Sequence, residues 1–341
     1  MRSFREILMP HARNDRRERN VASISALVVL VVLATTGCQT FSKKQIEAQY
    51  GPSEGILETI AVLRRHIPDD TYRFPPGTDF SGRNVYRASL LRIESLERAE
   101  ADALRSGYMK AVLLFAKGRA LERLRAFDLA AQQYRESARL SSDLRKSALE
   151  GAAICERLHQ ASKIGLDLVD PISGSGVDPL PLDPAAVRLD LDERTAQLSL
   201  LESELDDTHY RWIAQEEIER ADVIRAHYFV AMRFTLPDGT LVALQELQRV
   251  ATRHGGSKNR LRHLLRLGDF YAKLSDEYIE AIPPETLAFD PARYGELSDA
   301  AIQLFELVGS HDGRPEKLEA SRKLEAFLAR TLTVDADRFD R

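Results

Sequence analysis

Apolar residues recur every three to four positions along most of this chain, which is the spacing of one face of an α-helix. Clusters of proline and glycine interrupt this pattern at residues 68–84, 164–191 and 275–297. The pattern therefore predicts an all-α fold with irregular loop insertions, and a break at residues 206–208 in the longest helical stretch. Helices are expected over residues 46–66, 85–99, 108–124, 128–138, 192–234, 261–274 and 318–332.

One segment near the middle of the chain predicts two helices that meet through small residues. Its first helix runs to about Leu124, and its second begins near Asp128. Gly118 lies on the first helix and Ala130 on the second, so the helices can approach each other closely. Tyr134 follows Ala130 by one helical turn and shares its face. We expect these two helices to pack as a hairpin.

The residue pattern of the second helix of this hairpin recurs twice later in the chain. In each case an alanine is followed two residues later by a glutamine and four residues later by a large apolar residue. Such a degenerate repeat indicates helical hairpins that bury their apolar faces by stacking on neighbours. The three copies are Ala130-x-Gln132-x-Tyr134, Ala243-x-Gln245-x-Leu247 and Ala301-x-Gln303-x-Phe305.

With these residues the chain resembles the tetratricopeptide-repeat (TPR) family. Gly118 and Ala130 have the spacing of that family's ~34-residue unit, and Tyr134 takes its aromatic position. Gly151 opens the first helix of the next unit, and Gly268 lies in a second good match to a first helix. The resemblance covers residues 105–330, although no unit has the family's tryptophan. It implies a TPR-like solenoid of helical hairpins, wound as a right-handed superhelix.

The resemblance also implies a binding surface lined by the first helices of the units. A peptide segment or a helix of a partner protein would lie on that surface. The residues we expect to line it, and to bind the partner, are Arg119, Arg123, Arg266 and Asp269.

The start of the chain has the pattern of a secretory signal. Residues 2–20 are rich in arginine, residues 21–33 are apolar except for Ser23 and Ser25, and small residues precede Cys38. The Gly37-Cys38 ending resembles the lipobox of bacterial lipoproteins, with Thr35 where leucine is usual. The resemblance implies lipidation (palmitate) at Cys38. Because Gln39 follows Cys38, the resemblance also implies that the lipidated chain is transferred to the outer membrane, where it faces the periplasm. The alternative is an uncleaved signal anchor in the inner membrane.

These features divide the chain into seven parts. A signal peptide and a short tether precede a helical segment with a Pro-rich loop, whose aromatic stretch Tyr72–Phe80 is a candidate docking patch. Two TPR-like regions follow, separated by a Pro/Gly/Asp-rich linker, and the tail is expected to be frayed. The boundaries are 1–37, 38–44, 45–104, 105–163, 164–191, 192–332 and 333–341.

Composition bears on the fold class, and charge bears on the type of partner. Hydrophobic residues make up 44% of the chain and aromatic residues only 7%, which suits thin helical layers. Without residues 1–37 the chain has 42 basic and 49 acidic residues. That balance argues against nucleic acid as a partner.

No catalytic or cofactor motif is present, and no metal site is expected. Glu156 and His159 form a single carboxylate–histidine pair, where a di-iron bundle needs two pairs. Cys155 is expected to be a buried thiol. The acids at 216, 217 and 219 are expected to form a solvated face.

The sequence thus favours a membrane-tethered scaffold for protein–protein interaction in the cell envelope, without enzymatic activity. Three alternatives remain open: a lipoprotein that assists outer-membrane protein assembly, a helical enzyme acting on the cell wall, and a purely structural spacer.

Overall fold

The computed structural model of the protein describes residues 51–66, 85–102, 104, 108–165, 183–205 and 208–339. Cys38, the Tyr72–Phe80 loop and most of the linker lie outside these residues. All regular secondary structure in the described part is α-helical, as the apolar spacing predicts. Its helices are α2 (Gly51–His66), α3 (Val85–Ala99), α4 (Tyr108–Arg123), α5 (Phe127–Leu140), α6 (Ser142–Lys163), α7 (Pro184–Glu204), α8 (Tyr210–Met232), α9 (Gly239–Arg253), α10 (Arg260–Ala281), α11 (Pro291–Gly309) and α12 (Pro315–Phe339).

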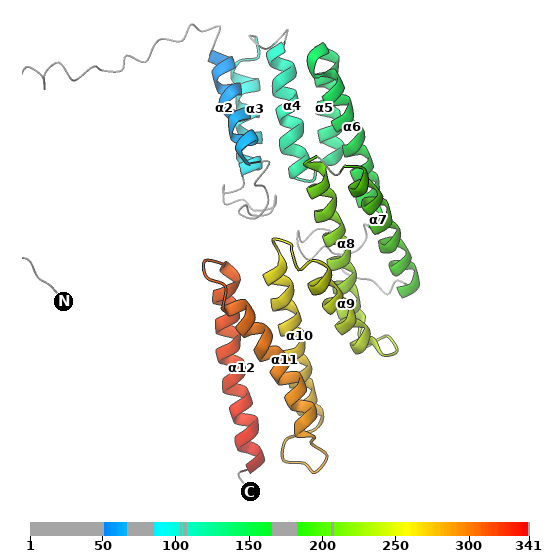
Figure 1. Ribbon diagram of the computed structural model, residues 1–341, viewed down its shortest axis with the longest axis vertical. Helices are drawn as coiled ribbons and strands as arrows, with labels where there is room; N and C mark the ends of the chain where they lie inside the picture. The colour runs from blue at the N-terminus through cyan, green and yellow to red at the C-terminus, as the bar shows by residue number, and fades with distance from the viewer. Residues whose placement is uncertain are drawn as a thin grey trace, which may run out of the picture. The chain divides into compact units, whose positions relative to one another are not determined.

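Successive helices pack against each other. From α3 onward, each helix contacts the next one along the chain (Figure 1). Second neighbours also touch, namely α4 with α6, α6 with α8 and α10 with α12. The apolar residues are accordingly buried in several local clusters.

Small residues allow the close contacts of the first hairpin. Ala130 is completely buried, and so is Tyr134. A Cβ atom on Gly118 of α4 would lie 2.7 Å from the Tyr134 ring, and one on Gly151 of α6 would lie 3.2 Å from it. The Tyr134 ring of α5 therefore fits between two glycines, one on the preceding helix and one on the following helix. Gly151 lies inside α6 rather than at its start, because Ser141 caps that helix by accepting a hydrogen bond from the Leu144 amide.

The hairpin of α10 and α11 repeats this contact. Ala301 is completely buried, and Phe305 follows it by one turn with its side chain also buried. A Cβ atom on Gly268 of α10 would lie 2.9 Å from the Phe305 ring. Ala243 of α9 is likewise buried, whereas Leu247, one turn later, is only partly buried.

Three stretches of the chain differ from the sequence-based expectation. Residues 184–191 were expected in the linker, but they are helical because Pro184 occupies the first turn and Asp183 accepts a hydrogen bond from the Ala185 amide. The interruption expected at 275–297 is shorter, since α10 continues to Ala281 and α11 begins at Pro291. The tail expected to be frayed is helical through Phe339.

A tight turn sets α9 against α8. Asp238 has a left-handed backbone (φ 51°), and a Cβ atom on Gly239 would lie 2.1 Å from the Arg233 carbonyl oxygen. Only glycine is therefore compatible with position 239. The Arg233 guanidinium lies over the Phe270 ring and pairs with Glu277, so the same turn is also tied to α10.

Candidate binding site

Helix α8 carries three buried carboxylates. Glu217, Glu219 and Asp222 have exposed fractions of 1%, 3% and 2%. The solvated face expected at 216, 217 and 219 is therefore wrong for Glu217 and Glu219. Burying an unpaired carboxylate is strongly unfavourable, so each of these groups needs cationic or hydrogen-bonding partners.

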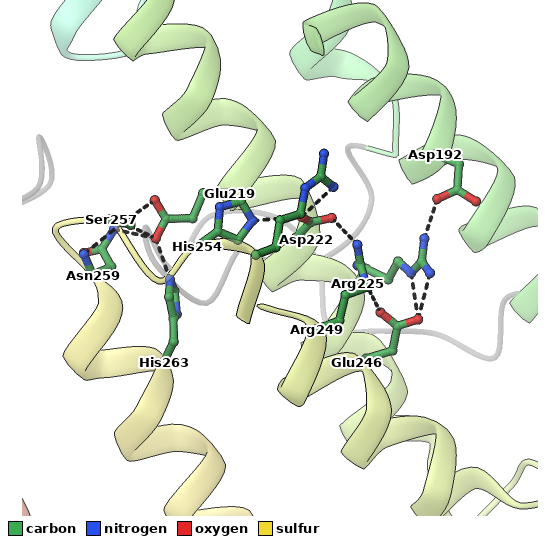
Figure 2. Close-up of polar contacts among 11 residues, drawn as sticks. Asp192, Glu219, Asp222, Arg225, Glu246, Arg249, His254, Ser257, Asn259 and His263 are labelled. Carbon is green, nitrogen blue, oxygen red and sulfur yellow. Dashed lines mark hydrogen bonds and ion pairs between the residues drawn. The ribbon is translucent and has the colours of Figure 1, made fainter. Parts of the chain in front are cut away.

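Asp222 receives its partners from the end of α9. Arg249 and Arg253 lie 2.8 and 3.0 Å from its two oxygens, and His254 Nε2 lies 2.8 Å away. Burial alone would raise the pKa of Asp222, but the hydrogen bond with His254 and the two arginine charges lower it overall. This carboxylate is thus ionised at neutral pH and holds α9 against α8 (Figure 2).

Glu219 contacts three side chains at the start of α10. Ser257 Oγ lies 2.7 Å from each of its two oxygens, which share the single hydroxyl hydrogen, and Oε1 accepts another hydrogen bond from Asn259 Nδ2 at 3.2 Å. His263 Nε2, one turn into α10, lies 2.5 Å from Oε1 (Figure 2). Burial acts to raise the pKa of Glu219, but the bonds from His263 and Ser257 lower it overall. A carboxylate at a helix N-terminus also interacts favourably with the helix dipole.

An arginine–carboxylate chain extends this network to α7. Arg225 of α8 pairs with Glu246 of α9 at 2.8 Å and with Asp192 of α7 (Figure 2). Arg249 donates to the other oxygen of Glu246 at 2.9 Å. Four helices, α7 to α10, are therefore joined through polar side chains.

Glu217 faces the opposite direction, toward the α4–α5 turn. Arg125, which has a left-handed backbone in that turn, donates to both its oxygens at 2.5 and 2.8 Å. Arg194 of α7 adds a bond of 3.2 Å. Burial would raise the pKa of Glu217, but Arg125, Arg220 and Arg194 lower it to about 2.

Arg119 and Arg123 are part of helix–helix contacts. Arg119 pairs with the buried Glu122 at 3.1 Å. Arg123 is almost completely buried and lies 3.3 Å from Glu216 of α8. A role for either arginine in partner binding stays a prediction, although these ion pairs already engage both side chains.

Glu122 is the centre of a further buried cluster. It accepts a hydrogen bond from Tyr134 Oη at 2.6 Å and lies 2.7 Å from His209 Nε2. Cys155 Sγ lies 3.8 Å away and is buried, as expected. Burial raises the pKa of Cys155, so it is a protonated thiol rather than a nucleophile.

A hollow of about 410 Å³ lies between α8, α9 and α10, and we call it the apolar hollow. Arg266 and Asp269, both expected to bind a partner, lie at its edge together with Lys273 and His227. Asp269 pairs with Lys323 of α12 at 2.7 Å. The structure thus brings together two of the four predicted partner-binding residues and places the other two elsewhere. Its apolar lining is Val223, Ala226, Val230, Leu247, Val250 and Phe270.

His263 connects this hollow with the acidic network. Its ring lines the apolar hollow and is 3% exposed, and its Nε2 is held by Glu219. The other ring nitrogen, Nδ1, is buried and has no hydrogen-bond partner among the described residues. The sequence offered no signal for this site beyond Arg266 and Asp269.

A second hollow of about 410 Å³, which we call the polar hollow, has a larger share of polar lining than the apolar hollow. It is lined by Trp212, which is 54% exposed, together with Glu216, Arg253 and Lys258. Glu216 pairs with Lys258 at 2.8 Å, and Arg253 pairs with Asp222. These polar groups already have partners within the chain, so this hollow is a weaker binding candidate.

The protonation state of Glu219 limits the chemistry that this residue could perform. Glu219, which also lines the polar hollow, is ionised and therefore unsuited to act as a general acid. Within the described ranges, no group of three or more His, Cys, Asp or Glu residues could hold a metal ion. None of the helices in the described part combines the length and apolar character needed to cross a membrane. Comparison with protein-family models and with curated proteins finds no match for this chain.

Proposed function

We propose that the chain is a TPR-like binding scaffold, tethered to a membrane through lipidated Cys38, and that the apolar hollow binds a segment of a partner protein in the cell envelope. The observation that carries this proposal is the hollow between α8, α9 and α10, with apolar walls and a charged rim. Such a combination suits an apolar side chain with polar neighbours.

The packing of the helices supports a TPR-like arrangement. The contacts of Gly118 with Tyr134 and of Gly268 with Phe305 occupy corresponding positions of two hairpins. Contacts between second neighbours such as α4 and α6 are those of a stack of hairpins. A right-handed superhelix remains part of the proposal.

The partner-binding role can be tested by photo-crosslinking in cells. A photoreactive residue replaces Lys273, at the rim of the hollow, in the full-length chain. Lys146, an exposed lysine of α6, is the matched control position. We expect a discrete adduct from position 273 that is lost when Val230→Asp places a charge in the hollow. The same adducts from both positions, or none from either, would contradict the proposal.

The tether is tested separately. Cys38→Ala should release the chain from the membrane fraction, because the acyl chains supply the anchor. Globomycin should cause a larger precursor to accumulate in the wild type. If the Cys38→Ala chain stays membrane-bound and no precursor appears, the signal-anchor alternative replaces lipidation.

A further inference from the structure

The polar hollow contains the single tryptophan of the chain. Trp212 lies in the first turn of α8, lines this hollow and is exposed. Among the described residues, no other ring and no cation lies against its indole, and its Nε1–H donates no hydrogen bond. A large aromatic ring that is accessible in a hollow offers apolar contact area to a ligand.

Three segments of the chain place polar side chains in the same hollow. Glu216 follows Trp212 by one turn and therefore shares its face of α8. Glu202 comes from the end of α7. Arg253 ends α9, and Lys258 lies in the turn before α10. Acceptors and donors from remote parts of the sequence thus line one hollow together with the indole.

The two glutamates keep hydrogen-bond acceptors that the chain does not use. Both ion pairs of Glu216 are made through its Oε1. Glu202 also uses its Oε1, which accepts from Gln215 at 2.5 Å and lies 3.8 Å from Arg211. Oε2 of each glutamate accepts no hydrogen bond from the described residues, and the side chains are 30% and 26% exposed. These oxygens are therefore accessible to a ligand.

The two cations keep hydrogen-bond donors. Lys258 donates one of its three hydrogens, to Glu216, and Arg253 uses one Nη of its guanidinium to donate to Asp222. Neither side chain is buried. A ligand that carried only one sign of charge would meet a like charge in this hollow, which is unfavourable. Groups that both donate and accept are the better match.

A sugar ring combines such groups with an apolar face. A pyranose presents C–H groups on one face, which can pack on an indole. Its hydroxyl groups lie around the edge of the ring, and each can donate one hydrogen bond and accept others. The volume of about 410 Å³ lies within the range of small-molecule sites.

We propose that the polar hollow binds an uncharged sugar residue of a glycan. One face of the sugar ring packs on Trp212, and its hydroxyl groups pair with Glu216 Oε2 and with Lys258. The polar hollow shares no lining residue with the apolar hollow. This inference therefore goes beyond the proposed function and does not depend on it.

The test uses the detergent-solubilised full chain and an array of oligosaccharides. The array carries uncharged glycans built from hexoses or N-acetylhexosamines, beside sulfated and sialylated ones. We expect saturable binding to an uncharged glycan. Because Trp212 is the only tryptophan, its fluorescence reports this site alone, and the same glycan in solution should shift its emission to shorter wavelength.

Matched variants identify the contacts. Trp212→Ala should weaken binding on the array about tenfold or more, because it removes the packing surface. Phe234→Ala, at another exposed ring, should leave binding unchanged. Lys258→Met should weaken binding about five- to tenfold, the usual range for one lost hydrogen bond, whereas Lys146→Met should not. Circular dichroism confirms that each variant keeps its helical content.

Three results would overturn this inference: no binding to any uncharged glycan on the array, binding to charged glycans only, or equal binding by wild type and Trp212→Ala. The crosslink from position 273 reports the apolar hollow alone. The inference and the proposed function can therefore fail independently of each other.

Discussion

At the scale of single residues, the fold depends on glycines that leave room for an aromatic ring of the next helix. Gly118 and Gly268 lie in helix interiors, where glycine is less favourable than alanine by about 1 kcal/mol. Their presence is explained by the rings of Tyr134 and Phe305, which occupy the space a Cβ atom would need. These glycines thus lower the local helix propensity but allow close packing between helices.

Gly118→Ala and Gly295→Ala should change stability in opposite directions. Gly118→Ala drives a methyl group into the Tyr134 ring, and such overpacking costs about 1–3 kcal/mol. A methyl group on Gly295 of α11 would meet nothing within 4 Å, so alanine there should add about 0.5–1 kcal/mol. Urea unfolding of both variants measures the difference, and equal shifts would show that the Tyr134 contact is not tight.

The buried carboxylate Glu217 should make stability depend on pH. Its pKa is lowered to about 2 in the folded chain, from an ordinary value of 4.5. A lowered folded-state pKa contributes stability above pH 4.5, and that stability is lost as the pH falls toward 2. Glu217→Gln should cost about 3 kcal/mol at pH 7, the usual cost of removing one partner from a buried ion pair.

Urea unfolding between pH 7 and pH 2 tests this dependence. The difference between wild type and Glu217→Gln should shrink as the pH falls below 4.5. Glu296→Gln, in an exposed pair with Arg293, is the control and should show almost no difference at any pH. A constant difference between wild type and Glu217→Gln across this range would refute the lowered pKa.

At the scale of elements, α8 is the helix through which its neighbours are joined. Its acidic residues bind the α4–α5 turn through Arg125, the end of α9 through Arg249 and the start of α10 through His263. Each contact joins a residue of α8 to a segment remote in sequence. The sequence pattern could not show this, because acids at helical spacing look the same on a solvated face and on a paired one.

Asp222→Asn should loosen one helix and leave the others in place. Asp222 holds Arg249, Arg253 and His254, so its neutralisation weakens the attachment of the end of α9 to α8. Amide hydrogen exchange should speed up in the second half of α9 and stay unchanged in α5. Uniform acceleration along the chain, or none, would contradict this local role.

At the scale of the whole molecule, the sequence predicted the helical fold and the small-residue contacts because both depend on local spacing. Ala130, Ala243 and Ala301 are buried as the repeat requires. Helix ends were less predictable, since proline breaks a helix in its interior, whereas Pro184 is favourable in a first turn capped by Asp183. The apolar hollow depends on three helices meeting, and only Arg266 and Asp269 pointed to it in advance.

The central claim is that the apolar hollow between α8, α9 and α10 binds a segment of a partner protein. The most direct test is the photo-crosslink from position 273, measured in the wild type and in Val230→Asp beside the control position 146. We predict a discrete adduct from position 273 that Val230→Asp abolishes, because a charge is unfavourable among the apolar side chains that line the hollow. An adduct that Val230→Asp leaves unchanged, or the same adducts from both positions, would contradict the account.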